Sequence, residues 1–410
     1  MKIFSFVLAA LLLATLGCAQ TPTPTLAPPS PSPAAMTEST GLLWYLLRGG
    51  PKADQAWSVD LDSAGYIYLA AYEQETGQFF TDMVIYKFTP EGEQVWRSPW
   101  GGQFQEKAFI VDVDEPYVYV GGLTQDSIDL TQADMTVLAL DAATGKILWE
   151  FVWGQGFGYE EVDGLVAEGD YIFVSGWTTS EKTGGDIGVL KLDRQGGKVW
   201  DSVWGTDGFD GADGQMVVSE DSIYVSGRTN GVNMLLGGQA AVVRFSKDTG
   251  EYLQHATWGD SAMADGLGMT SDGTSLYVVG INLTLGRGNQ IILLKYDQDL
   301  NLLWDEVWGD EEGEHVGRAA AVDDQGNVLL AVNSRPTSTG PDDVVLLKYG
   351  PDGNLAWESR WPMPDDEVVH GLAVVGDFAY LAGEIKYLDQ NDSQALLIKA
   401  DSRTGQFPPP

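Results

Sequence analysis

The strongest constraint on the fold is a repeat of 50 to 54 residues that occurs seven times from residue 41 onward. Its marker is Trp-x-x-x-Trp-Gly, as in ILWEFVWG at 147–154, VWDSVWG at 199–205 and LLWDEVWGD at 302–310. Twelve of the chain's 14 tryptophans stand in two columns that lie four residues apart. A repeat of this length indicates a propeller or a solenoid.

The two aromatic columns predict how the repeats contact one another. The first column has Gln254 in one repeat and tryptophan in the others: Trp44, Trp96, Trp149, Trp200, Trp304 and Trp357. The second column holds Arg48, Trp100, Trp153, Trp204, Trp258, Trp308 and Trp361. Residues i and i+4 of a strand lie on the same face, so we expect both columns to pack between repeats. The alternative, stacking on a ligand, would not need one pair in every repeat.

Three further apolar runs in each repeat have the character of short strands. Examples are GLVA at 164–167, YIFVSGW at 171–177 and IGVLKL at 187–192. They are rich in β-branched and aromatic residues and end at turn residues, and no helical periodicity appears. Four strands per repeat and seven repeats predict an all-β, seven-bladed β-propeller with antiparallel blades over residues 41–405.

The phase of the repeats predicts how the ring closes. The chain begins with a lone fourth strand at 42–50 and ends with a repeat that has no fourth strand. We therefore expect the N-terminal strand to complete the last blade, which removes an exposed sheet edge.

The residues before the repeats predict export. Lys2 precedes an apolar run over 3–16, and Gly17-Cys18 follow, so residues 1–17 have the features of a signal peptide. The end of this segment resembles a bacterial lipoprotein signal, which implies lipidation of Cys18 and a location on the membrane or cell surface. The alternative is an ordinary cleaved signal with a spare thiol. Residues 18–40 are mostly Pro, Thr, Ser and Ala and predict an extended tether.

Charge and cysteine content restrict the partners. The chain has 59 acidic and 23 basic side chains, a formal net charge of −36, which argues against binding to nucleic acid. Cys18 is the single cysteine, so a monomer has no internal disulfide. We expect a monomer whose partner is a protein or a glycan of the cell envelope.

The repeat also resembles known propeller families. The stretch ALDAATGKILWEFVWG, which ends at Gly154, is similar to the tryptophan-docking motif of quinoprotein dehydrogenases. The whole repeat, with LLKYD, a Gly turn and WxxxWG in succession, resembles the secreted bacterial repeats called SBBP. Quinoprotein enzymes have eight blades and a vicinal cysteine pair, which this chain does not have, so a PQQ-dependent activity is not expected. A lipid-anchored propeller that assists assembly of outer-membrane proteins is a further analogue.

Two polar columns predict the binding face. One precedes the innermost strands and consists of Asp54, Glu106, Asp163, Asp213, Asp265 and His370. The other precedes the third strands and consists of Asp82, Asp134, Asp186, Gln239, Gln290, Asp343 and Gln394. Both lie on loops of one face, together with the long loops 73–81, 124–133, 229–238 and 385–393. The first column could ring the channel mouth and hold Ca²⁺, and no other cofactor is expected. The interpretation we favour is that both columns cap backbone amides.

The sequence favours a binding or scaffold module that has no catalytic residues and uses this loop face. Of the three histidines, His315 and His370 are expected in loops before first strands, and none has metal-ligand spacing. The alternative is an extracytoplasmic hydrolase or lyase with carboxylates at the channel mouth. Convergence of those carboxylates with Arg228, Arg287 or Arg318 would favour it.

Overall fold

The computed structural model describes residues 43–409, except 51, 76, 130, 157, 180–183, 234–235, 260–261, 337–339, 362 and 388–391. Secondary structure in this part of the chain is entirely β, in agreement with the prediction of an all-β fold. The signal segment, Cys18 and the tether lie outside the described residues.

The first three blades follow one another along the chain. Blade 1 consists of β2 (Gln55–Leu61), β3 (Ile67–Glu73), β4 (Asp82–Phe88) and β5 (Gln94–Trp100). Blade 2 consists of β6 (Glu106–Asp114), β7 (Tyr117–Thr124), β8 (Asp134–Asp141) and β9 (Ile147–Trp153). Blade 3 consists of β10 (Glu161–Glu168), β11 (Tyr171–Thr178), β12 (Asp186–Asp193) and β13 (Lys198–Trp204).

The next two blades differ in their innermost strands. Blade 4 has an interrupted innermost strand, β14 (Phe209–Gly211) and β15 (Met216–Val218), followed by β16 (Ser222–Asn233), β17 (Leu236–Ser246) and β18 (Tyr252–Trp258). Blade 5 consists of β19 (Met263–Ser271), β20 (Ser275–Leu283), β21 (Asn289–Asp297) and β22 (Leu302–Trp308).

The last two blades contain both ends of the propeller. Blade 6 consists of β23 (Glu314–Val322), β24 (Val328–Arg335), β25 (Asp343–Tyr349) and β26 (Leu355–Trp361). Blade 7 consists of β27 (Asp366–Val375), β28 (Phe378–Tyr387), β29 (Asp392–Asp401) and β1 (Trp44–Arg48). The strands of each blade pair antiparallel, and one parallel bridge, Asn289–Glu314, links blades 5 and 6.

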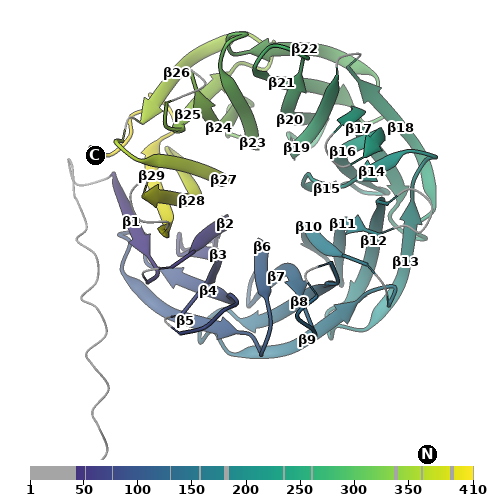
Figure 1. Cartoon of the computed structure of the whole chain (residues 1–410), viewed down its shortest axis with the longest axis vertical. Coiled ribbons are helices and arrows are strands. Elements are labelled where there is room, and N and C mark those ends of the chain that lie inside the picture. The colour runs from purple at the N-terminus through teal and green to yellow at the C-terminus, as the bar shows by residue number, and fades with distance from the viewer. Residues whose placement is uncertain are drawn as a thin grey trace, which may run out of the picture. The chain divides into compact units, whose positions relative to one another are not determined.

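The blades form a ring around a central channel, with β2, β6, β10, β15, β19, β23 and β27 innermost (Figure 1). The sheet order confirms the predicted seven-bladed propeller. Each core cluster lies between neighbouring blades: one joins Tyr68 and Ile85 of blade 1 to Val120 and Leu138 of blade 2. Because each blade buries both of its faces against neighbours, the middle strands are apolar along most of their length.

The N-terminal strand closes the ring as predicted. Strand β1 pairs antiparallel with β29, and Trp44 lies opposite Lys399 in the register. Trp44 and Leu46 are 4% and 2% exposed, so this short strand is fixed by burial as well as by its ladder. A parallel bridge between Ala53 and Ser393 ties the next turn to the same blade.

The loops after the second and fourth strands emerge on one face, which we call the loop face. The backbone amide of Glu106 donates to the carbonyl of Thr81 at 2.9 Å, and the amide of Glu160 donates to Ala133 at 2.8 Å. Between blades 6 and 7, the backbone amide of Glu367 donates to the backbone carbonyl of Asp342 at 3.0 Å. The start of each of these blades is therefore bonded to the blade before it.

The first tryptophan of the repeat packs on a turn of the next blade. The indole of Trp149 donates to the carbonyl of Arg194 at 3.0 Å, and that of Trp357 donates to Arg403 at 2.9 Å. The turn glycine lies directly against the ring: a Cβ at Gly196 would come within 2.9 Å of Trp149. Most of these tryptophans are half-buried, because the fourth strand is the outermost strand of its blade.

The glycine that follows the second tryptophan makes room for a residue of the second polar column. A Cβ at Gly101 would come within 2.1 Å of the Asp82 carboxylate. In blade 5, the Gln290 amide donates to the carbonyl of Gly309 at 2.8 Å. This contact explains why glycine follows tryptophan in the repeat, since a side chain at this position would displace the polar residue.

Three local predictions about the loop face are wrong. His315 and His370 lie within β23 and β27 instead of in loops, because these innermost strands begin several residues earlier than predicted. Asp163 and Asp265 likewise lie inside β10 and β19. Residues 229–233 and 236–238 continue the β16–β17 hairpin instead of forming an irregular loop.

Candidate functional site

A buried polar residue begins the innermost strand in six blades, and we call this set the capping column: Asp54, Glu106, Glu160, Asp210, His315 and Glu367. Blade 5 has Ala264 at this position. The Asp54 carboxylate accepts hydrogen bonds from the amides of Gly50 at 2.7 Å and Gln74 at 2.9 Å. It thereby joins the turn before the blade to the loop after its second strand.

Burial raises the pKa values of four carboxyl groups in this column. The pKa of Asp54 rises to about 7, chiefly through burial, and the amides of Gln74 and Gly50 oppose the shift. Glu106 and Glu160 also rise to about 7, again because burial disfavours the charged carboxylate. The pKa of Glu367 rises to about 9, because the Asp343 and Asp365 carboxylates add to the effect of burial.

A second set of side chains lies three residues beyond the capping column, and we call it the channel ring: Trp57, Phe109, Asp163, Asp213, Leu267, Arg318 and His370. Six of these residues are at β-bulges of the innermost strands, where the register shifts by one residue. Asp213 lies in the break between β14 and β15. A bulge takes one side chain out of the regular alternation of strand faces. Here the bulges lie on the strands that surround the channel.

The structure divides the predicted ring of carboxylates between these two sets. Asp54 and Glu106 belong to the capping column, whereas Asp163, Asp213 and His370 belong to the channel ring. Asp265 is next to the capping position of blade 5 and is 4% exposed. Sequence reasoning named Arg318 as a candidate but missed Trp57, Phe109 and Leu267, although each stands nine residues after the second aromatic column.

One side of the channel ring is aromatic. The rings of Trp57 and His370 stack at 4.1 Å between centroids and 7° between planes. Phe109 meets Trp57 edge-on at 4.8 Å. These three residues come from the neighbouring blades 7, 1 and 2, so they form one continuous wall.

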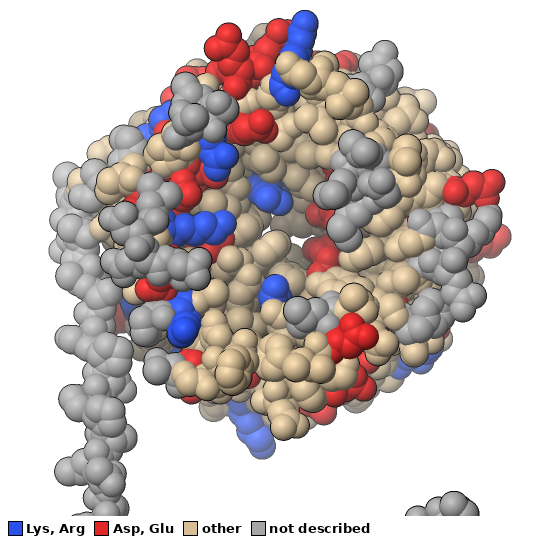
Figure 2. All heavy atoms as spheres, in the orientation of Figure 1, with Lys and Arg blue, Asp and Glu red and all other residues tan. Residues whose placement is uncertain are grey.

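The other side of the channel ring is charged. Burial raises the pKa of Asp163, and the nearby carboxylates of Glu161 and Asp213 raise it further. Burial likewise raises the pKa of Asp265, with the Asp213 carboxylate as the next cause. Burial lowers the pKa of Arg318, and the charges of Asp213 and Asp265 oppose that shift. Figure 2 shows acidic and basic side chains around the open mouth of the channel on the loop face.

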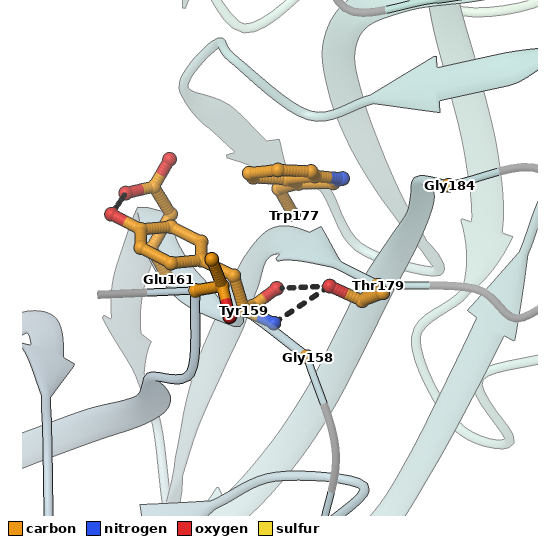
Figure 3. A pocket seen from close by; sticks show the side chains of 7 residues that line it. Gly158, Tyr159, Glu161, Trp177, Thr179 and Gly184 are labelled. Carbon is orange, nitrogen blue, oxygen red and sulfur yellow. Dashed lines mark hydrogen bonds between the residues drawn. The ribbon is translucent and has the colours of Figure 1, made fainter. Parts of the chain in front are cut away.

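A pocket of about 640 Å³ opens on the loop face between blades 2 and 3. It is lined by Thr131, Gly158, Tyr159, Glu161, Trp177, Thr179 and Gly184. The indole of Trp177 and the ring of Tyr159 lie 5.3 Å apart at 40° and form its aromatic wall (Figure 3). The Trp177 indole N–H has no hydrogen-bond partner among the described residues.

The polar groups of this pocket are held in place by neighbours. The Tyr159 hydroxyl donates to the Glu161 carboxylate at 3.0 Å, and the Thr179 hydroxyl donates to the Tyr159 carbonyl at 3.0 Å (Figure 3). Burial raises the pKa of Glu161, and the Asp213 carboxylate adds to the shift. Glu161 therefore lines the pocket, and it also interacts electrostatically with the charged side of the channel ring.

A smaller, more polar pocket of about 310 Å³ lies between blades 5 and 6. Its walls include His315 and Arg360, whose side chains are already bonded to Ser334 and Asp343 at 3.0 and 2.7 Å.

The described residues contain no group of three or more His, Cys, Asp or Glu side chains placed to hold a metal ion. The predicted Ca²⁺ site therefore has no preformed set of ligands in this part of the chain. The second polar column instead makes internal contacts, such as the hydrogen bond from the Gln239 amide to Gly259 at 2.7 Å. In the described part of the chain, no helix is long and apolar enough to cross a membrane.

Comparisons with known proteins agree with this fold. A family model described as "Outer membrane protein assembly factor BamB" matches residues 81–185. This region is a PQQ-like, BamB-type propeller repeat region. No curated protein matches the chain.

Solved structures are similar to this chain at low sequence identity. The Pan2 WD40 domain of Neurospora crassa has a TM-score of 0.52 and 10% identity, over 87% of this chain and 91% of that one. The β-propeller domain of the Trilobed protease from Pyrococcus furiosus has a TM-score of 0.46 and 11% identity, over 86% and 97%. At 10% identity the likeness to the Pan2 WD40 domain is one of fold alone.

Proposed function

We propose that this chain is an exported, lipid-anchored binding module without catalytic activity, which holds a protein or glycan partner on its loop face. The observation that carries the proposal is the pocket between blades 2 and 3. It combines two aromatic rings, an indole N–H that has no hydrogen-bond partner among the described residues, and the Glu161 carboxylate. Apolar walls with a few oriented polar groups are the usual composition of a ligand site.

The position of the pocket supports a docking role. Its residues come from loops of two blades and from β10 and β11, so the pocket has a rigid base and variable rims. Binding residues are commonly carried on such loops over a rigid scaffold. The predicted lipid at Cys18 and the proline-rich tether would hold this face clear of the membrane.

The test is binding to a glycan panel and to envelope proteins, with wild type and Trp177→Ala compared. We expect Trp177→Ala to lose partners that wild type retains, because it removes most of the aromatic wall. Tyr117→Ala is the matched control, since Tyr117 is 37% exposed at the start of β7, on the opposite face. Equal retention by all three proteins would contradict a role for the pocket.

A second candidate function is hydrolysis with acid–base catalysis by the channel carboxylates. The observation that favours it is that Asp163 and Asp265 both have raised pKa values and both lie near the Asp213 carboxylate. Burial that raises the pKa of a carboxyl group is a common way to make a general acid. Turnover of chromogenic glycosides or esters that disappears in Asp213→Asn would support this function, and no turnover by wild type would remove it.

A further inference from the structure

The pocket between blades 2 and 3 is built on an aromatic ring whose orientation is fixed by its neighbours. Trp177 is half-buried near the end of β11 and lines the pocket. The edge of the indole that carries the nitrogen is closely packed: a Cβ at Gly185 would come within 2.3 Å of Nε1 and within 2.7 Å of the Phe209 ring. Phe209 of blade 4 lies 5.9 Å from the indole between ring centroids. The pocket therefore offers a ligand a rigid apolar ring surface.

The second ring of the pocket, Tyr159, is held through its backbone. The Tyr159 amide donates to the Thr179 hydroxyl at 2.7 Å, and that hydroxyl donates to the Tyr159 carbonyl at 3.0 Å. A parallel bridge between Ala133 and Tyr159 ties this loop to blade 2. The two rings lie 5.3 Å apart at 40°, so one continuous aromatic wall exists before a ligand binds.

One polar atom beside this wall is free to bind a ligand. The hydroxyls of Thr131, Tyr159 and Thr179 all donate to neighbouring groups. The Tyr159 hydroxyl engages Glu161 Oε2, whereas Oε1 makes no hydrogen bond with the residues that the structure describes (Figure 3). Glu161 lies opposite Trp177 in the register of β10 and β11, so both side chains are on the same face of the blade.

The free oxygen favours a ligand that carries hydroxyl groups. A hydroxyl donates to an ionised carboxylate and accepts from a protonated carboxyl, so it binds Glu161 in either form. Burial and the Asp213 carboxylate raise the pKa of Glu161, which makes this independence of charge important. A cation would be attracted only by the ionised form. An anion would find no Lys or Arg side chain among the described residues that line the pocket.

A sugar ring combines an apolar surface with hydroxyl groups. Its C–H groups pack on an aromatic ring, and the hydroxyls at its edge donate and accept hydrogen bonds. Proline-rich peptides also pack on aromatic grooves, but proline has no N–H and would leave Glu161 Oε1 without a donor. The pocket volume of about 640 Å³ is larger than one hexose unit requires, so we expect at least two linked sugars.

We propose that the pocket between blades 2 and 3 binds a neutral oligosaccharide. One sugar ring packs on Trp177 and Tyr159, and a hydroxyl of the same sugar chain contacts Glu161 Oε1. This inference rests on the proposed function and narrows it from a protein or glycan partner to an uncharged sugar chain.

The test is isothermal titration calorimetry of the full chain with four neutral sugars: cellotriose, maltotriose, mannotriose and triacetylchitotriose. We expect at least one to bind at one site per chain with a Kd below about 1 mM. The cationic glucosamine trimer and the anionic trigalacturonate should bind at least about tenfold more weakly than that sugar. A peptide with the sequence of residues 22–33, which is rich in proline, is a further arm.

Three results of this titration would overturn the inference. The first is no heat from any of the four neutral sugars up to about 10 mM. The second is a charged sugar that binds as tightly as the best neutral one. The third is binding of the proline-rich peptide with none of the sugars.

Variants locate the sugar in the pocket. Trp177→Ala is expected to weaken binding at least about tenfold and Trp177→Phe less than about threefold, which separates loss of the ring from loss of the fold. Glu161→Leu should weaken binding at least about fivefold and Glu161→Gln less than about threefold, since an amide also donates and accepts. Tyr117→Ala, on the opposite face, should stay within about twofold of wild type. Full retention in Trp177→Ala, or equal losses in Glu161→Gln and Glu161→Leu, would overturn the inference.

The inference and the proposed function fail in different ways. If Trp177→Ala loses a protein partner that wild type retains, and no neutral sugar binds, the inference is wrong and the proposed function stands. If the sugars bind wild type and Trp177→Ala equally and no partner depends on Trp177, both are wrong.

Discussion

Gln254 and Leu300 occupy, at the interface of blades 4 and 5, the positions that tryptophan and glycine hold at the other six interfaces. The Gln254 amide donates to the carbonyl of Asp299 at 3.0 Å, as four of the six indoles do to the corresponding turns. Leu300 has a φ of 60° and is 8% exposed, so it keeps the left-handed turn while it packs into the core. Without an indole opposite, the turn residue can carry a side chain, although a non-glycine residue is strained at this φ.

This pair predicts a coupled effect on stability. We expect Gln254→Trp alone to destabilise the propeller by about 1–3 kcal/mol, because the indole would overlap the Leu300 side chain. Leu300→Gly alone should cost about 1–2 kcal/mol through lost burial, partly offset by the relaxed turn. The double variant should recover at least about 1 kcal/mol relative to the sum of the single changes.

Urea unfolding of the four proteins, followed by tryptophan fluorescence and by circular dichroism, measures the coupling. The matched comparison is the equivalent pair at the interface of blades 3 and 4, Trp200 and Gly250. There, a Cβ on the glycine would come within 2.6 Å of the indole. Additive effects of the two substitutions would show that residues 254 and 300 do not respond to each other.

The capping column predicts that acid stabilises the fold. In the folded state Asp54, Glu106 and Glu160 titrate near pH 7 and Glu367 near pH 9, against about 4 to 4.5 in the unfolded chain. The folded state thus binds more protons than the unfolded state between these values, so the free energy of unfolding falls as pH rises from about 4.5 to 9.

We expect the chain to be more stable at pH 5 than at pH 8.5, by on the order of a few kcal/mol in total. Thermal and urea unfolding at both pH values measure the difference. Glu367→Gln removes one of these titrations, so its stability should fall less between pH 7 and pH 8.5 than that of wild type. A stability that rises with pH over this range, or an unchanged slope in Glu367→Gln, would contradict the assignment.

Ring closure predicts that tryptophans at equivalent positions differ in importance. Trp44 is 4% exposed in the strand that closes the ring, and we expect Trp44→Ala to cost about 3–5 kcal/mol. Trp96 is half-buried at an internal interface, so Trp96→Ala should cost less, about 1–3 kcal/mol. Denaturant midpoints give both values. An equal loss of stability in the two variants would mean that ring closure makes Trp44 no more important than Trp96.

The N-terminal segment predicts a lipid on Cys18. We expect the chain, expressed in bacteria with its own leader, to incorporate an alkyne-labelled fatty acid and to sediment with membranes. Cys18→Ser should lose the label and appear in the soluble exported fraction, with the propeller still folded. A labelled Cys18→Ser protein, or an unlabelled wild type, would favour the ordinary cleaved signal.

The class of fold, the number of blades, the closure by β1 and the packing of the tryptophan columns between repeats can all be predicted from the sequence. These features follow from spacing along the chain, because a strand pairs with its sequence neighbour and each blade repeats the same contact. Even the exchange at Gln254 and Leu300 can be found by aligning the repeats.

Which side chains meet in the channel and in the pocket depends on contacts between blades, which the sequence pattern does not reveal. A β-bulge shifts one residue out of the alternation, so Asp163 and His370 turned out to share a ring with Trp57 and Arg318 instead of with Asp54 and Glu106. The burial of His315 and the contact of Tyr159 with Trp177 likewise depend on neighbours from other strands and loops. Burial and charge at a site arise from groups brought together across blades, and strand periodicity carries no information about them.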